Sequence, residues 1–239
     1  MKLGIMQPYF LPYIGYWQLI NAVDVFVVYD NTQYTKKGWF NRNRYLLNGK
    51  DAKFSINIKN DSDFLNVNLR LLSPEYKRKK LIATLKNAYH RAPMKKEAFP
   101  VIERIINSPN DNLFNYIYNS ITEICEYLNI NTKTVVASTI NVDHSLKSEQ
   151  KVIAICKELQ TDVYINPIGG MKLYSKENFS KENIELKFIK SKQIIYQQFD
   201  NKFIESLSIL DVMMFNSAEK INGMLDKYEL FADNGKIHV

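Results

Sequence analysis

The sequence predicts a layered α/β fold, in which a parallel sheet is covered by helices. Three observations lead to this prediction. Residues 1–30 read as strand, loop, helix and strand, which is a compact βαβ unit. Strand-like and helix-like segments continue to alternate over most of the 239 residues. Residues 25–29 form an unbroken apolar run rich in β-branched and aromatic side chains, which is typical of a strand buried on both faces.

The first elements follow from short local signals. Residues 2–6 are predicted as a buried strand, and residues 7–12, which begin and end near prolines, as a loop. Residues 13–22 show the helical spacing of apolar side chains, and residues 24–29 form the second strand. We expect these two strands to lie in the centre of the sheet.

The middle of the chain contains a hairpin signal and then a long helical region. Asn48-Gly49-Lys50 favours a tight turn between strand-like residues 45–47 and 52–58. Ser73-Pro74-Glu75 combines a cap, a proline and an acid, so a helix is predicted from there to about residue 89. Residues 73–130 contain no good strand, and we predict a helical insertion or subdomain there.

The remaining elements complete the alternation. Helices are predicted at residues 112–128, 148–159 and 208–215, and strands at residues 134–137, 162–166 and 185–189. Together the elements predict one Rossmann-like α/β domain that spans residues 1–239.

The composition is that of a globular protein. Apolar residues make up 46% and charged residues 24%, which excludes collagen-like and disordered chains. Two cysteines, Cys125 and Cys156, are too few for a disulfide framework. The sequence shows neither a signal-peptide pattern nor a stretch near the roughly 18 apolar residues of a membrane helix. We therefore expect a soluble, cytoplasmic protein with no membrane span.

Positive charge is concentrated in the first half of the chain. Residues 1–100 hold 17 Lys and Arg against 7 Asp and Glu, whereas residues 101–239 hold 15 against 18. Residues 76–96 alone contain eight basic residues and no acid. This asymmetry favours an anionic partner near the N-terminal half, such as a phosphate, a nucleotide, a nucleic acid or an acidic membrane surface. The alternative for residues 76–96 is a solvated helix face.

Ligands of open parallel sheets bind beyond the carboxyl ends of the strands. Three loops are predicted there, at residues 7–15, 30–44 and 166–174. The second loop is the densest in polar and aromatic side chains: Asp30, Asn31, Gln33, Tyr34, Trp39, Asn41, Arg42, Asn43 and Arg44.

The side chains of the second loop suit a nucleotide-linked sugar. Amides both donate to and accept from sugar hydroxyls, and aromatic rings offer flat apolar faces. Arg42 and Arg44 could hold a diphosphate through paired hydrogen bonds. The alternative is an ordered loop with turn-forming asparagines, followed by two arginines that alternate on a strand.

Asp30 is the candidate general base, because it follows a buried strand at the ligand end. The three histidines are dispersed and lack metal-ligand spacing, and no metal site is predicted. Asp211 lies in an otherwise apolar helix, where it could either hold a structural network or point into the site. We expect one cleft to be lined by Gln7, Tyr13, Tyr16, Asp30, Gln33, Asn41 and Arg42.

Several segments resemble the WbqC-like family. They are Gln7-Pro8-Tyr9-Phe10-Leu11-Pro12-Tyr13-Ile14-Gly15-Tyr16, then residues 24–30 with Gln33-Tyr34 and residues 39–44, then residues 89–93 and 210–216. Genes of this family lie largely in clusters for O-antigen and other surface polysaccharides. The resemblance therefore implies a role in the biosynthesis of bacterial surface sugars.

A second resemblance is to the HxGH region of nucleotidylyltransferases and pantothenate synthetase. Tyr13-Ile14-Gly15-Tyr16 would occupy that motif after the first strand, with tyrosines in place of both histidines. A neutral tyrosine can donate a hydrogen bond but cannot supply imidazolium charge. This similarity implies a nucleotidylyltransferase-like fold without the usual adenylyl transfer, and it makes Tyr13 and Tyr16 catalytic candidates beside Asp30.

The resemblance and the residues together suggest a transferase that acts on a nucleotide-linked sugar. We expect transfer of an acyl or aminoacyl group to the nitrogen of an amino sugar, from a donor such as an acyl-coenzyme A or an acyl phosphate. No cofactor is assigned. A glycosyltransferase is the alternative, although Asp61-Ser62-Asp63, which has the letters of a DxD motif, lies in a polar turn. A sugar- or nucleic-acid-binding module without enzymatic activity is a third possibility, and nucleic acid is the less favoured partner.

Overall fold

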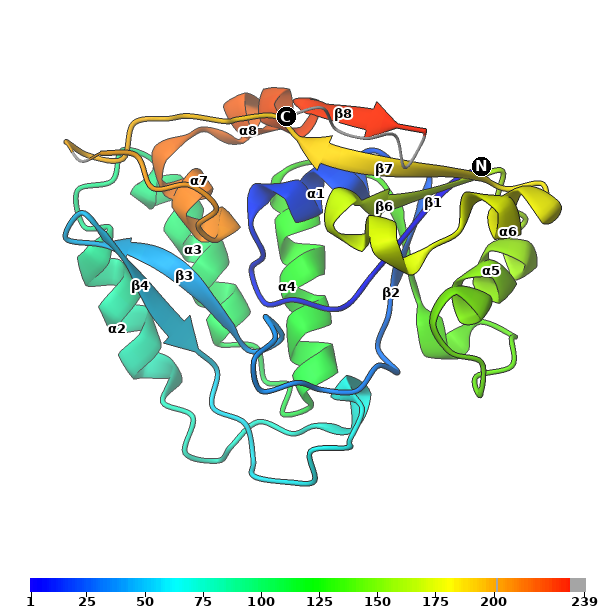
Figure 1. Cartoon of the computed structure of the whole chain (residues 1–239). Helices are drawn as coiled ribbons and strands as arrows, with labels where there is room; N and C mark the ends of the chain where they lie inside the picture. The colour runs from blue at the N-terminus through cyan, green and yellow to red at the C-terminus, as the bar shows by residue number, and fades with distance from the viewer. Residues whose placement is uncertain (201, 233–239) are drawn as a thin grey trace.

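A computed structural model describes residues 1–200 and 202–232 of the chain (Figure 1). Its main sheet has six strands in the order β5-β2-β1-β6-β7-β8. The strands are β1 (Lys2–Met6), β2 (Val25–Val28), β5 (Lys133–Val136), β6 (Val163–Pro167), β7 (Glu185–Ser191) and β8 (Tyr228–Phe231). Strands β1, β2, β5, β6 and β7 run parallel, and β8 is antiparallel to β7. The predicted α/β class is confirmed, and so is the placement of β1 and β2 inside the sheet.

Helices cover both faces of this sheet. The helices of the described residues are α1 (Ile14–Asn21), α2 (Arg78–Ala88), α3 (Lys95–Ile106), α4 (Leu113–Tyr127), α5 (Ser148–Glu158), α6 (Lys176–Lys181), α7 (Ile209–Phe215) and α8 (Ala218–Leu225), of which α2 lies against α3. The hairpin of β3 (Arg42–Leu47) and β4 (Lys50–Ser55) forms a separate two-stranded sheet. In Figure 1 the hairpin lies beside α2, away from the main sheet.

Strand β2 explains how two cores arise from one run of apolar residues. Side chains alternate across a strand, so Phe26 and Val28 face one side of the sheet and Val25 and Val27 the other. The first side packs against α1, α3, α4, α7 and α8, and the second against α5 and α6. All four residues of β2 are buried, as the continuous apolar pattern predicts.

Three helices, α2, α3 and α4, fill the region between β4 and β5. Their apolar side chains join the same core as α1 and β2. The predicted helix start at Ser73 is wrong, because the hydroxyl and carbonyl of Ser73 accept from the amides of Glu75 and Tyr76 and close a turn instead. Helix α2 begins five residues later, at Arg78.

Two further features of the fold have local causes. Pro100 lies inside α3, where burial of an apolar face that includes Phe99 and Ile102 offsets the one lost backbone bond. Strand β8 is not predicted from the sequence, because it has only four residues and lies at the antiparallel edge of the sheet. Only Tyr228 and Phe231 are half-buried, so the alternation of apolar and polar residues is weak.

Candidate functional site

Gln7 and Asp30 lie at the same edge of the sheet. Strands β1 and β2 are parallel and in register, with Met6 opposite Val28. The Tyr29 amide donates to the Met6 carbonyl at 2.8 Å, just beyond that pair. The carboxyl ends of both strands therefore present their following loops on one side, as predicted.

Gln7 is held in a network of side chains from both loops. Its Oε1 accepts from the Tyr9 hydroxyl at 2.9 Å, and its Nε2 donates to Thr32 Oγ1 at 3.4 Å. The Tyr16 hydroxyl donates to the Gln7 carbonyl at 3.0 Å. Tyr16 is only 2% exposed, and burial raises the pKa of its hydroxyl well above the ordinary value. Tyr16 thus supports the Gln7 backbone from within the core.

Tyr13 is far more exposed than Tyr16. It is 42% exposed and occupies the position that precedes α1. Its ring crosses Gly15 so closely that a Cβ atom there would lie 2.4 Å from Tyr13 Cε2. A side chain at position 15 would therefore displace the exposed Tyr13 ring.

Asp30 is buried, with 2% of its surface exposed. Its Oδ1 accepts from the Ser138 amide at 2.9 Å, and its Oδ2 accepts from Asn68 Nδ2 at the same distance. Both carboxylate oxygens are thus engaged by groups that join the end of β2 to the segments after β5 and before α2. This geometry suits a residue that positions its neighbours.

Lys151 and His144 complete this edge, and neither was predicted as a site residue. Lys151 is 3% exposed, and its ammonium lies 5.2 Å from the Tyr29 ring centroid and 3.4 Å from the His144 carbonyl, to which it donates. Burial lowers the pKa of Lys151, and the charge of Asp30 opposes the shift. His144 Nδ1 is 3.0 Å from Asn31 Nδ2. The only signal in the sequence was a lysine at an otherwise apolar position of a helix.

The third predicted loop follows β6. Asn166 is buried, and its Nδ2 donates to the Tyr164 hydroxyl at 2.8 Å. A Cβ atom on Gly170 would lie 2.2 Å from Asn166 Oδ1, so the glycine allows this amide to approach the backbone. Residues 168–173 form a short 3₁₀ turn.

A cavity of about 480 Å³ lies between the β3–β4 hairpin and the segment that follows it. We call it the basic pocket. Five of its lining side chains are cationic and one is acidic. The full lining is Tyr34, Lys36, Asn41, Arg42, Lys53, Phe54, Ser55, Ile58, Lys59, Asn60, Asp61 and Arg70. The excess of positive charge makes the cavity suitable for an anionic ligand.

Residues 65–68 run beside residues 30–34 and so connect the basic pocket to the sheet edge. The Asn68 amide donates to the Asp30 carbonyl at 3.2 Å, and the Tyr34 amide donates to the Leu65 carbonyl at 3.0 Å. Arg70 follows this paired segment directly. The two parts of the candidate site thus share one backbone framework.

Arg70 is the least expected residue of the basic pocket. It is 2% exposed, and its guanidinium lies 4.7 Å from the Tyr34 ring centroid. One terminal nitrogen donates to the Ser62 carbonyl at 2.6 Å, whereas Nε has no hydrogen-bond partner in the described part of the chain. A buried cation with no acidic partner at bonding distance is costly unless another group compensates it.

Arg42 also lines the basic pocket. Its Nε donates to the Gly38 carbonyl at 2.9 Å, and its guanidinium lies 6.0 Å from the ring centroid of Trp39, which is 42% exposed. Within the described residues, its terminal nitrogens make no hydrogen bond or ion pair. Asn41 is fixed beside it, since its amide accepts from the Tyr34 hydroxyl and donates to the Ile56 carbonyl.

Three other predicted residues lie outside the lining of the basic pocket. Asn43 is buried and donates to the carbonyls of Phe10 and Leu11. Arg44 pairs with Asp51 and donates to the carbonyls of residues 205 and 206. Gln33 is exposed and donates to the Asp63 carbonyl. The structure thus brings Tyr34, Asn41 and Arg42 together at the cavity and places Gln7, Tyr13, Tyr16 and Asp30 at the sheet edge.

Two findings concern residues 1–200 and 202–232. No group of three His, Cys, Asp or Glu side chains is arranged to hold a metal ion in these ranges. Within the same ranges, no helix has both the length and the apolar character needed to cross a bilayer.

Comparison with known proteins agrees with the resemblance inferred from the sequence. The profile of the WbqC-like protein family matches residues 7–223. An uncharacterized protein of Mycobacterium tuberculosis, Rv1507c, is 24% identical over 233 residues, which cover 91% of this chain and 95% of that protein. No solved structure gives a significant match. The similarity to the HxGH proteins stays a prediction.

Proposed function

The chain belongs to the WbqC-like protein family, and on that premise we propose that it is a transferase of bacterial surface-polysaccharide biosynthesis that acts on a nucleotide-linked sugar. The basic pocket is the binding site in this proposal, and its volume of about 480 Å³ lies in the range of small-molecule sites. The transferred group is an acyl or aminoacyl group, and the acceptor is the nitrogen of an amino sugar.

The observation that carries the proposal is the pair of arginines at the basic pocket. Within the described residues, Arg42 has free terminal nitrogens, and Arg70 is a buried cation without an acidic partner at bonding distance. A diphosphate would supply the missing negative charge, and guanidinium groups bind phosphate oxygens through directed hydrogen bonds. Lys53 and Lys59 add to the positive potential of the same cavity.

The proposed reaction forms an amide. The unprotonated nitrogen of the amino sugar attacks the acyl carbonyl carbon, a C–N bond forms, and the bond to the leaving group breaks with its electron pair. The proton lost from nitrogen passes to a base or to solvent. The donor is an activated acyl compound such as a thioester. Such a reaction depends chiefly on positioning and on stabilisation of the oxyanion.

Asp30 is a positioning residue in this proposal. Its carboxylate already accepts from the Ser138 amide and from Asn68, and the same segment continues to Arg70. Loss of the carboxylate would release both segments from the end of β2. The predicted roles of Tyr13 and Tyr16 remain predictions. Tyr13 is the one of the two whose side chain is exposed.

One observation favours glycosyl transfer as a second candidate. Asp61 lines the basic pocket, and Asp63 pairs with Lys36 at 2.9 Å. The Asp61-Ser62-Asp63 segment therefore lies beside the proposed diphosphate site, although the sequence places it in an ordinary polar turn. Carboxylates in that position resemble those that glycosyltransferases place beside the diphosphate of a nucleotide sugar.

One experiment separates the candidates. The purified protein is first screened by thermal shift against UDP-, dTDP- and GDP-linked sugars, since a ligand that binds only the folded state raises the melting temperature. Sugars that bind are then incubated with acyl-coenzyme A compounds, and the products are analysed by mass spectrometry. Acyl transfer adds the acyl mass to an intact nucleotide sugar. Release of the nucleoside diphosphate would instead indicate glycosyl transfer, and binding without any product would leave a sugar-binding module.

A further inference from the structure

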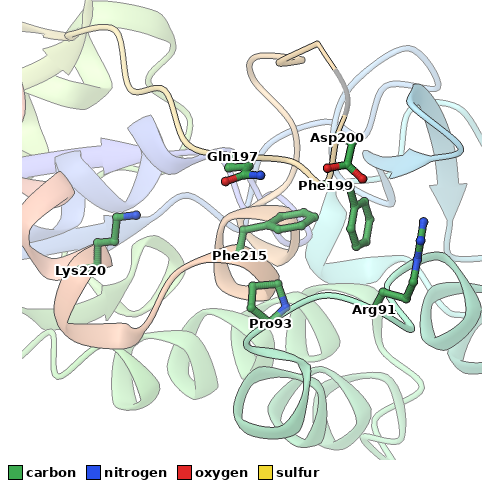
Figure 2. Close-up of a pocket in the computed structure, with 7 residues that line it drawn as sticks. All are labelled: Arg91, Pro93, Gln197, Phe199, Asp200, Phe215 and Lys220. Carbon is green, nitrogen blue, oxygen red and sulfur yellow. The ribbon is translucent and has the colours of Figure 1, made fainter.

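A second cavity lies at the far end of the hairpin, between α7, α8 and residues 197–200. Its volume is about 460 Å³, and it is lined by Arg91, Pro93, Gln197, Phe199, Asp200, Phe215 and Lys220. We call it the second pocket. Figure 2 shows Lys220 and Arg91 at its opposite ends, with the rings of Phe215 and Phe199 between them. None of these residues takes part in the proposed transfer site.

The second pocket is separate from the basic pocket. Arg91 and Phe199 also line a smaller cavity beside the hairpin turn at Asn48 and Gly49. The basic pocket lies at the other end of the same hairpin, where Arg42 pairs with Ser55. A strand rises about 3.3 Å per residue, so the six-residue strands separate the two ends of the hairpin by roughly 17 Å.

The aromatic wall of the second pocket is held in a defined geometry. The ring centroids of Phe199 and Phe215 are 4.8 Å apart and nearly perpendicular. Phe199 has a φ of 51°, a left-handed conformation that is strained for a large side chain. The strained backbone aims the Phe199 ring at the cavity, and the Arg91 guanidinium lies 5.7 Å from its centroid.

A buried hydrogen-bond network centred on Asp211 supports this aromatic wall. Asp211 is fully buried, and its carboxylate accepts from Tyr89, Tyr196 and Gln198, each at 2.7 Å. The rings of Tyr89 and Tyr196 lie 6.0 and 6.3 Å from the ring of Phe215. The network therefore holds Phe215 in place, which is the preorganisation that a binding site requires.

Two cations at the rim of the second pocket are available for a ligand. Arg91 and Lys220 are exposed, and neither makes a side-chain hydrogen bond or ion pair with any described residue. Gln197 and Asp200 provide acceptors for hydroxyl or amino groups on the facing side. The cavity thus combines flat apolar faces, positive charge at both ends and a few polar groups.

We propose that the second pocket binds a nucleoside phosphate, with the base against Phe199 and Phe215 and the phosphate at Arg91 or Lys220. Aromatic faces contribute affinity for any base through stacking, and a guanidinium holds phosphate oxygens. This inference does not depend on the proposed transfer reaction.

The test uses AMP and UMP as probes, titrated by calorimetry into the Arg42→Ala variant, so that the basic pocket contributes little. We expect saturable binding that either Arg91→Gln or Lys220→Gln, each added to that variant, weakens roughly tenfold, because the substitution at the residue that holds the phosphate removes a charged contact. Lys96→Gln, which removes an exposed charge of α3 outside the second pocket, should leave the affinity unchanged. Adenosine and ribose 5-phosphate should each bind more weakly than AMP.

A second measurement needs no substitution in the second pocket. AMP should slow amide hydrogen exchange in residues 196–200 of the unmodified protein. The proposal is overturned if neither nucleotide binds at millimolar concentration, if Arg91→Gln and Lys220→Gln bind as tightly as their parent, or if ribose 5-phosphate binds as tightly as AMP. The transfer reaction, assayed separately by its products, is unaffected by any of these outcomes.

Discussion

The guanidinium of Arg70 lies 4.7 Å from the centroid of the Tyr34 ring, and the Tyr34 hydroxyl in turn donates to Asn41 at 2.9 Å. Arg70 is thereby held flat against one wall of the basic pocket, with Arg42 at another. An arginine stacked in this way is more rigid than a lysine, and it loses less freedom when it binds an anion. The relationship joins residues 36 positions apart into one binding surface.

Replacement of Arg70 by methionine tests whether its charge serves folding or binding. A buried charge without an ionic partner costs desolvation energy, and a neutral side chain of similar length is often tolerated. We therefore expect Arg70→Met to change the free energy of unfolding by less than about 1 kcal/mol, or to raise it, while affinity for a nucleotide sugar falls. Urea unfolding and calorimetry measure the two quantities. A loss of stability of about 3 kcal/mol with unchanged affinity would assign Arg70 to the fold alone.

Asp30→Asn should lower turnover far more than binding. The amide cannot accept from both the Ser138 amide and Asn68, so the segments it positions would lose one contact. We also expect a loss of stability on the order of 1–3 kcal/mol, because one buried donor is left unpaired. Steady-state kinetics separates kcat from KM, and the activity is normalised to the folded fraction. If only stability falls and the folded fraction keeps its full specific activity, Asp30 has no role in the reaction.

Asp211 makes a prediction about pH. Burial raises its pKa, against the effect of three hydrogen bonds that favour the ionised form. The folded protein therefore binds this proton more tightly than the unfolded chain does. The resulting stability is fully present below the unfolded pKa of about 3.9, and it is lost as the pH rises through the folded value.

The Asp211→Asn variant lacks this titration and serves as the comparison. The free energy of unfolding of the wild type minus that of the variant should be larger at pH 4 than at pH 7.5. Urea unfolding at both pH values measures it. A difference that grows toward pH 7.5 would mean that the hydrogen bonds from Tyr89, Tyr196 and Gln198 outweigh desolvation.

The two thiols should be inert in the native protein. Burial raises the pKa of both Cys125 and Cys156 to about 12, so the reactive thiolate is scarce at pH 8. A chromogenic aromatic disulfide should therefore report almost no free thiol in native buffer and two per chain in urea. Rapid reaction in native buffer would show that one of the two packing environments opens readily.

The sequence indicated those features that depend on local pattern. The continuous apolar run of β2 and the alternating elements were enough to place the sheet and its ligand edge, because burial on both faces leaves a direct mark on composition. The first loop is likewise close in sequence to the strand that positions it.

Features that depend on contacts between distant parts of the chain could not be predicted from the sequence. Arg70 reaches the basic pocket because residues 65–68 run back along residues 30–34, and no local pattern predicts that pairing. Ser138 meets Asp30 only because β5 lies beside β2, more than 100 residues away in the chain. Asp61-Ser62-Asp63 resembles any polar turn until the cavity beside it is known.

The central claim is that the basic pocket binds the diphosphate of a nucleotide sugar, and inorganic pyrophosphate tests it most directly. Calorimetric titration should show binding to the wild type that Arg42→Ala weakens by roughly 10- to 150-fold, which corresponds to about 1.5–3 kcal/mol for a charged contact. Arg44→Ala is the matched control, since it removes the same charge from the same strand outside the pocket lining. Equal affinity in the wild type and Arg42→Ala, or an equal loss in both variants, would contradict the account.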